Sequence, residues 1–276
     1  MKLGFMQGRL SPIYRNRIQA FPWNNWKKEF GVANSLGIEI MEWTIDSFKF
    51  HSNPIFSKKG IKEIQLLKKK NKLKINSITV DYFMENPFWR SQNQNNIKLQ
   101  NDLVKLINSC AVLKIKFLII PIVDNGSFKN NNEEKFLVNY LNLIKKTLFK
   151  KKVQIIFETD MAPKNVLSFI KKLDDKIFGI NYDIGNSAGL GYKLENEFKI
   201  YGKYIKNVHL KDKKKGGITT RFGNGDANFI NLFKMLKKYK YNGNYILQSA
   251  RAKKGKNQID ELVYNFNYIK NIYEKK

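Results

Sequence analysis

The sequence predicts an α/β protein built as a closed (β/α)8 TIM barrel. Short runs of apolar and β-branched residues alternate with longer amphipathic segments along the whole chain. Eight such runs, each followed by a segment of helical periodicity, fit into 276 residues, and a barrel of this size is commonly one domain. No G-x-G-x-x-G motif follows the first run, so an open nucleotide-binding sheet is the less favoured alternative.

The expected elements alternate in order along the chain. The strands are expected at residues 2–6, 38–43, 74–80, 117–123, 153–159, 178–184, 205–211 and 244–250. The helices, where apolar residues recur at three- and four-residue steps, are expected near 25–36, 57–71, 95–113, 133–150, 163–173, 195–204, 227–239 and 258–273. Asn-Gly and Gly-rich turns, such as those at 125–126 and 223–225, separate the units.

The composition narrows the classes of partner. The net charge of +28 would attract phosphates, but most of the excess is Lys scattered over the expected helices, so a nucleic-acid partner is not favoured and an anionic small substrate fits equally well. The single Cys110 lies at an apolar helical position, which predicts a packed thiol. Without a secretion signal or an apolar run of roughly 18 residues, we expect a cytoplasmic protein with no membrane partner.

Three expected strands in the second half of the chain each deliver a potential metal ligand. These are Glu158, Asp183 and His209, which lie 25 and 26 residues apart, about the length of one strand, one helix and two loops. Consecutive parallel strands would place the two carboxylates and the imidazole side by side. This donor set suits a divalent cation such as Mn²⁺, Mg²⁺, Co²⁺ or Zn²⁺.

Polar residues also stand at the carboxyl ends of the other expected strands, where barrel enzymes carry their chemistry. Alone, each of them could be a loop residue or a helix cap. Their coincidence predicts an active site at this end of the barrel. The residues are Arg9, Glu42, Asp81, Asp124 and Gln248, with Arg251 just beyond.

Several motifs resemble the xylose isomerase-like TIM barrel superfamily, and within it the sugar phosphate isomerase/epimerase branch. They are GFMQGRLSP, IEIMEW, TVDYFMENP, FETDMAP, NYDIGNSAGLGY and NVHLKDKKKGG. The likeness covers nearly the whole chain and implies a single xylose isomerase-like TIM barrel domain over residues 1–276. It also implies a divalent metal held by a Glu, an Asp, a His and a second Glu from strands five to eight.

Glu158, Asp183 and His209 match the first three positions of that ligand set, and Gln248 stands at the fourth. A Gln offers a carbonyl oxygen to a metal but does not accept a proton as a carboxylate does. The resemblance implies proton abstraction next to a sugar carbonyl through an enediolate, with Glu158 as base. An epimerase needs a second acid/base residue, which Glu42 or Asp81 could supply. An aldose-ketose isomerase or a dehydratase would need only one base.

We therefore expect a metal-dependent sugar or sugar-phosphate isomerase or epimerase with Glu158 and Glu42 as catalytic residues. Arg9 and Arg251 could clamp a phosphate or carboxylate of the substrate, and Asp81 and Gln248 could contact it as well. Either arginine could instead be a structural counter-ion, and Glu42 could form a buried salt bridge, for example to Arg9.

Two other classes of protein remain as alternatives. One is a non-catalytic carbohydrate- or metabolite-binding barrel, in which Gln248 in place of a Glu indicates that catalytic activity has been lost. The other is a relative of the abasic-site endonucleases, whose zinc sites require several histidines, and this chain has only two. The oligomeric state stays open, because a basic helical exterior is compatible with a monomer or a homo-oligomer.

Overall fold

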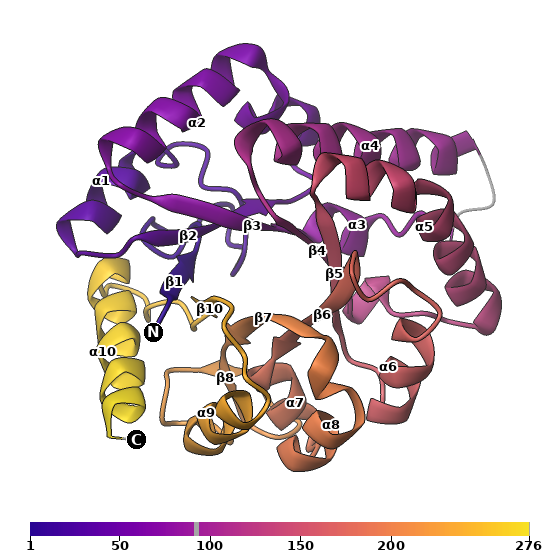
Figure 1. Ribbon diagram of the computed structural model, residues 1–276. Helices are drawn as coiled ribbons and strands as arrows, with labels where there is room; N and C mark the ends of the chain where they lie inside the picture. Colours follow the sequence, from indigo (N-terminus) through magenta and orange to yellow (C-terminus); the bar gives the residue numbers. More distant parts are fainter. Residues whose placement is uncertain (91–93, 276) are drawn as a thin grey trace.

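The computed structural model describes residues 1–90 and 94–275 and contains a closed parallel barrel (Figure 1). Neighbouring strands follow each other in chain order around the barrel, and the last strand closes onto the first. The barrel strands are β1 (Leu3–Met6), β2 (Ile40–Ile45), β3 (Lys74–Val80), β4 (Phe117–Ile122), β5 (Gln154–Thr159), β6 (Phe178–Asp183), β7 (Ile205–Leu210) and β10 (Tyr245–Leu247).

The helices form a ring around the barrel (Figure 1). Each covers the strands with an apolar face, and several begin with a polar cap, such as Ser57 before α2 and Asn130 before α5. The longer helices are α1 (Lys28–Ser35), α2 (Lys58–Lys70), α4 (Gln94–Leu113), α5 (Asn131–Lys151), α6 (Pro163–Ile170), α8 (Leu194–Tyr201), α9 (Phe229–Lys238) and α10 (Gln258–Glu274).

The expected fold is confirmed, and every expected strand and helix is present within a few residues of its predicted bounds. Two short helices were not expected: α3 (Asp81–Glu85) and α7 (Ile184–Leu190). Each begins at the residue directly after its strand, so no turn residues lie between strand and helix to indicate where the helix starts. A small antiparallel pair, β8 (Asp212–Lys213) and β9 (Thr219–Thr220), was also unforeseen.

The strands bury different residues on their two faces. Their outward side chains pack with the helices in one large apolar core, which includes Phe157 on β5 and Leu247 on β10. The inward side chains include small apolar clusters, one of them formed by Met6, Ile40 and Ile246. Because successive strand residues alternate between faces, the residue two positions after Ile40 or Ile246 also points into the barrel.

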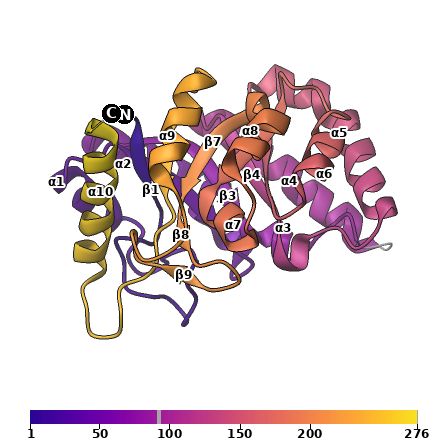
Figure 2. The ribbon, with the colours of Figure 1, turned by 90° about the horizontal axis from the view of Figure 1, so that it is seen from below.

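The pair β8–β9 lies at the end of the barrel opposite to the two chain termini (Figure 2). The Gly-rich turn that follows this pair is held by Asp212. The carboxylate of Asp212 accepts the backbone amides of Gly223, Gly225 and Ala227 at 2.8, 3.0 and 3.1 Å. These amides, which would suit a bound anion, are therefore occupied by a side chain of the protein itself.

The thiol of Cys110 is fully buried in α4, and burial raises its pKa to about 12. The predicted packed thiol is therefore confirmed. Within residues 1–90 and 94–275, none of the helices combines the length and apolar character that crossing a membrane requires.

Candidate metal centre and active-site cavity

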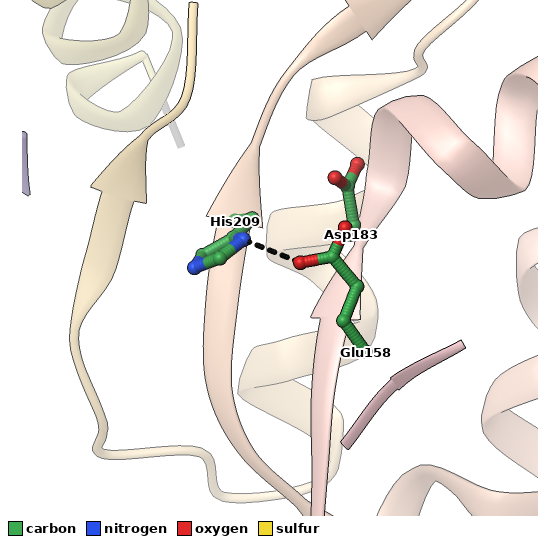
Figure 3. A group of neighbouring side chains, drawn as sticks. All are labelled: Glu158, Asp183 and His209. Atoms are coloured by element: carbon green, nitrogen blue, oxygen red, sulfur yellow. Dashed lines mark ion pairs between the residues drawn. The ribbon is translucent and has the colours of Figure 1, made fainter. Parts of the chain in front are cut away.

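Glu158, Asp183 and His209 lie close together near the carboxyl ends of β5, β6 and β7, and the carboxylate of Glu158 faces the imidazole of His209 (Figure 3). One potential ligand atom from each of the three side chains lies within 4.8 Å of the others, and all three residues are buried. The structure thus brings together the three residues that the sequence spacing singled out. Asp183 also caps α7, because its Oδ1 accepts the backbone amide of Asn186 at 2.9 Å.

His209 lies between two buried carboxylates. Its Nε2 lies 2.7 Å from Oε1 of Glu42, and its Nδ1 lies 2.9 Å from Oε2 of Glu158. Burial alone lowers the pKa of His209, but the charges and hydrogen bonds of Glu42 and Glu158 outweigh burial and raise it to about 10.

Glu42 is enclosed inside the barrel. Its two carboxylate oxygens accept hydrogen bonds from Ser77 Oγ and Thr79 Oγ1, both at 2.6 Å, and from Asn207 Nδ2 at 3.2 Å. The side chain has no exposed surface, and its ion pair is with His209 rather than with Arg9. Glu42 does not line the cavity described below, so its geometry favours orienting His209 over touching a substrate.

The orientation of His209 tests whether a metal fits. The pKa of about 10 keeps His209 protonated on both nitrogens, with Nδ1 in an ion pair with Oε2 of Glu158 at 2.9 Å. A cation that displaced the proton of Nδ1 would gain its lone pair, while Nε2–H would still donate to Glu42. Within the described residues, the oxygen Oε1 of Gln248 is buried without a hydrogen-bond partner. One imidazole nitrogen, one carbonyl oxygen and two carboxylates form a donor set that fits a divalent cation.

A hydrogen-bonded chain of amides supports these carboxylates from inside the barrel. Asn207 Nδ2 also donates to Asn181 Oδ1 at 2.8 Å, Asn181 Nδ2 donates to Glu158 Oε2 at 3.1 Å, and Asn186 Nδ2 donates to Glu158 Oε1 at 2.8 Å. None of these three asparagines was predicted to belong to the site. Two of them could have been found from the period of two along each strand, which places Asn181 on the same face as Asp183 and Asn207 on the same face as His209.

Lys211 is a fourth residue of the site that was not predicted, although it lies within the sequence HLKD at 209–212. Its Nζ donates to Asp183 Oδ2 at 3.0 Å and to Asn186 Oδ1 at 3.1 Å, and its side chain is 16% exposed. Burial raises the pKa of Glu158, but hydrogen bonding and charge from His209, followed by the charge of Lys211, lower it to about 2. Glu158 is therefore held in its ionised form.

A cavity of about 330 Å³ opens beside these groups. Its wall is mixed in charge, with the cations Arg9, Lys211 and Lys213 facing several carboxylates. Such a wall suits a polar small molecule. The lining residues are Arg9, Ile18, Gln19, Asp81, Met84, Pro121, Val123, Asp124, Glu158, Asp160, Asn186, Leu190, Lys211, Lys213, Thr219, Gln248 and Ser249.

The two arginines that the sequence analysis paired have different positions. Arg9 lines the cavity, and its Nε and Nη1 donate to the carbonyls of Ser249 and Ile18 at 2.9 and 3.0 Å. Burial, together with the nearby charge of Arg251, lowers the pKa of Arg9 to about 9. Arg251 is not among the lining residues, and it donates to the carbonyls of Gly8 and Ser11. Its contacts therefore hold the loop after β1.

Asp81 begins α3 at the end of β3 and lines the same cavity as Glu158. It is only 7% exposed, and its Oδ2 accepts a hydrogen bond from Gln19 Nε2 at 2.7 Å. Burial first, and then the charge of Glu158, raise the pKa of Asp81 to about 7. A carboxyl group with this pKa exchanges its proton near neutral pH.

The chain belongs to the xylose isomerase-like TIM barrel family, whose model matches residues 30–270. This match covers the elements that carry Glu42, Asp81, Glu158, Asp183 and His209. The sequence match therefore shows the family, and the closed barrel is the fold that its description names.

Two curated relatives match over part of their length. An inosose dehydratase from Clostridium botulinum is 24% identical over 176 residues, which are 54% of this chain and 58% of that protein. An uncharacterized protein from Methanocaldococcus jannaschii is 29% identical over 86 residues, which are 30% of this chain and 29% of that protein. The matched regions thus span less than two thirds of either relative.

Solved structures show the same fold over almost the whole chain. The D-psicose 3-epimerase of Clostridium cellulolyticum H10, solved with D-tagatose, superposes with a TM-score of 0.76 at 13% identity, covering 99% of both chains. A xylose isomerase-like TIM barrel protein of Mycobacterium smegmatis, solved in complex with magnesium, has a TM-score of 0.70 at 14% identity and covers 99% of this chain and 96% of its own.

Proposed function

We propose that this protein is a divalent-metal-dependent enzyme that moves a proton on a carbon next to the carbonyl of a sugar or sugar phosphate, as an isomerase or epimerase. The observation that carries the proposal is the buried cluster of Glu158, Asp183 and His209, in which one potential ligand atom from each side chain lies within 4.8 Å of the others. The D-psicose 3-epimerase and the magnesium-containing protein of the same fold support it.

The metal would be held by the carboxylates of Glu158 and Asp183, Nδ1 of His209 and Oε1 of Gln248. A bound Mn²⁺, Mg²⁺, Co²⁺ or Zn²⁺ would polarise the substrate carbonyl and stabilise the negative charge that develops on its oxygen. Lys211, which donates to Asp183, adds positive charge on the same side of the cavity.

Glu158 and Asp81 are the proposed proton-transfer residues. Both line the cavity, Glu158 from the end of β5 and Asp81 from the end of β3. Glu158 would accept the carbon-bound proton, and Asp81, with a pKa of about 7, would exchange the second proton. This assignment replaces the catalytic role expected for Glu42, whose carboxylate is enclosed by Ser77, Thr79, Asn207 and His209.

The cationic part of the wall favours a substrate that carries negative charge. Arg9 is 3% exposed, and within the described chain its hydrogen bonds run to backbone carbonyls and not to a carboxylate. A buried guanidinium without an ion pair is costly unless a ligand supplies the counter-charge. Arg9 and Lys213 would therefore bind the phosphate of a sugar phosphate. The binding partner of this protein would then be a small molecule.

A sugar dehydratase is the second candidate. Gln248 does not accept a proton, and elimination of water needs one base and one acid, which Glu158 and Asp81 would supply. The partial match to an inosose dehydratase favours this candidate.

Solvent deuterium exchange tests the proposal. The protein with Mn²⁺ is incubated in heavy water with a panel of ketoses, ketose phosphates and inososes, beside Glu158→Gln and the exposed control Glu274→Gln. We expect deuterium to enter one substrate with the native chain and the control but not with Glu158→Gln. The labelled carbon distinguishes an epimerase from an isomerase, and loss of water identifies a dehydratase. No exchange with any compound would contradict the proposal and favour a binding protein.

A further inference from the structure

We propose that Gln19, on the loop between β1 and α1, is a positioning residue that turns the side-chain amide of Gln248 so that its oxygen faces the metal site. The inference rests on the proposed function, because it requires that Glu158, Asp183 and His209 bind a metal. It concerns position 248, where this chain has a Gln and the family resemblance implies a Glu as metal ligand.

Gln19 connects two strand ends across the cavity. Its Oε1 accepts a hydrogen bond from Gln248 Nε2 at 2.9 Å, and its Nε2 donates to Asp81 Oδ2 at 2.7 Å. All three side chains line the cavity. The result is a continuous chain of hydrogen bonds from the end of β10, through the loop, to the start of α3.

The chemistry of Asp81 fixes the direction of this chain. Above its pKa of about 7, Asp81 is a carboxylate that only accepts hydrogen bonds, so Gln19 presents its NH₂ group to Asp81 Oδ2. The oxygen of Gln19 then faces Gln248 and requires a donor, which is the NH₂ group of Gln248. Consequently the oxygen of Gln248 is on the side away from Gln19.

That oxygen has no hydrogen-bond partner in the described chain although it is buried. The register places it near the cluster. Ile246 on β10 lies beside His209 on β7, and Gln248 follows Ile246 by two residues on the same inward face. A buried carbonyl oxygen without a donor is unfavourable by itself, and a divalent cation would satisfy it.

The backbone on both sides of Gln19 is anchored, so its side chain has a defined place. Arg9 Nη1 donates to the carbonyl of Ile18 at 3.0 Å, and Arg17 forms an ion pair with Glu85. After Gln19, the amide of Phe21 donates to Asp46 Oδ2 at 3.2 Å.

An orienting partner matters for a Gln ligand more than for a Glu ligand. Either oxygen of a carboxylate binds a cation, so a half-turn of the side chain changes nothing. A half-turn of Gln248 would replace its oxygen by an NH₂ group, which does not bind a cation. The effect of Gln19 should therefore depend on whether residue 248 is Gln or Glu.

Calorimetric titration with Mn²⁺ tests this dependence in a double-mutant cycle. We expect Gln19→Leu to weaken Mn²⁺ binding about tenfold or more, in the range seen when a residue that orients a metal ligand is removed. In the Gln248→Glu background, the same Gln19→Leu change should alter the affinity less than about twofold. The matched control is Gln154→Leu, because Gln154 is half-buried at the opposite end of the barrel, where it bonds Lys206. It should bind Mn²⁺ as the native chain does.

Two results would overturn the inference while leaving the proposed function intact: native Mn²⁺ affinity in Gln19→Leu, or equal weakening in both backgrounds. Failure of the native chain to bind Mn²⁺ would overturn both proposals. Weakening by Gln154→Leu to the same extent as by Gln19→Leu would also overturn the inference, because the loss would then not be specific to residue 19.

Discussion

Nε2 of His209 lies 2.7 Å from Oε1 of Glu42, on the edge of the ring opposite to the nitrogen that faces Glu158. The contact decides which nitrogen of His209 carries a proton when the other binds a ligand. Glu42 is itself fixed by Ser77 and Thr79 on the neighbouring strand. The imidazole thus has one orientation, with Nδ1 toward the two other candidate ligands.

Glu42→Gln should weaken Mn²⁺ binding about tenfold to a hundredfold, because a neutral amide holds the imidazole less firmly and makes it a weaker ligand. Calorimetry measures the affinity, and the exposed Glu274→Gln serves as control. If Glu42 were instead a catalytic residue, the variant would lose turnover while keeping native Mn²⁺ affinity.

Asp81→Asn should stabilise the metal-free protein at pH 8. The raised pKa of about 7 means that folded Asp81 holds its proton more tightly than the unfolded chain does. Its contribution to stability is therefore present at low pH and is lost as the pH rises through 7. Urea unfolding with EDTA should show a gain from Asp81→Asn that is about 2 kcal/mol larger at pH 8 than at pH 5. The exposed control Asp260→Asn should show no such difference, and an equal gain for Asp81→Asn at both pH values would refute the assignment.

Arg9→Lys should reduce the preference for a phosphorylated substrate. A lysine keeps the charge but loses the planar fork that bonds Ser249 and Ile18. We expect KM for the sugar phosphate to rise about tenfold, with KM for the unphosphorylated sugar nearly unchanged. Arg251→Lys is the matched control, because Arg251 bonds Gly8 and Ser11 outside the cavity. An equal rise for both substrates would argue against a phosphate contact at Arg9.

The fold and the central cluster could be predicted because both depend on local patterns in the sequence. The alternation of apolar runs and amphipathic segments predicted all eight strands of the barrel. Since the carboxyl ends of parallel strands meet at one face of the barrel, the spacing of Glu158, Asp183 and His209 was enough to predict that their side chains lie close together.

The supporting residues could not be predicted in the same way. Gln19 lies on a loop without regular periodicity, and its role depends on contacts with Asp81 and Gln248, which are 62 and 229 residues away. Glu42 stands at a strand end like the other acidic residues. Only the three-dimensional positions of Ser77 and Thr79 show that its carboxylate is enclosed.

The most direct test of the metal centre is a titration of the EDTA-treated protein with Mn²⁺, comparing the native chain with Asp183→Asn. Asn keeps the side-chain oxygen that caps α7 but removes the charge that a metal would bind. We predict one Mn²⁺ per native chain and a loss of affinity of a hundredfold or more in Asp183→Asn, with unchanged helical content by circular dichroism. Absence of Mn²⁺ binding by the native chain, or equal affinity in the variant, would contradict the account.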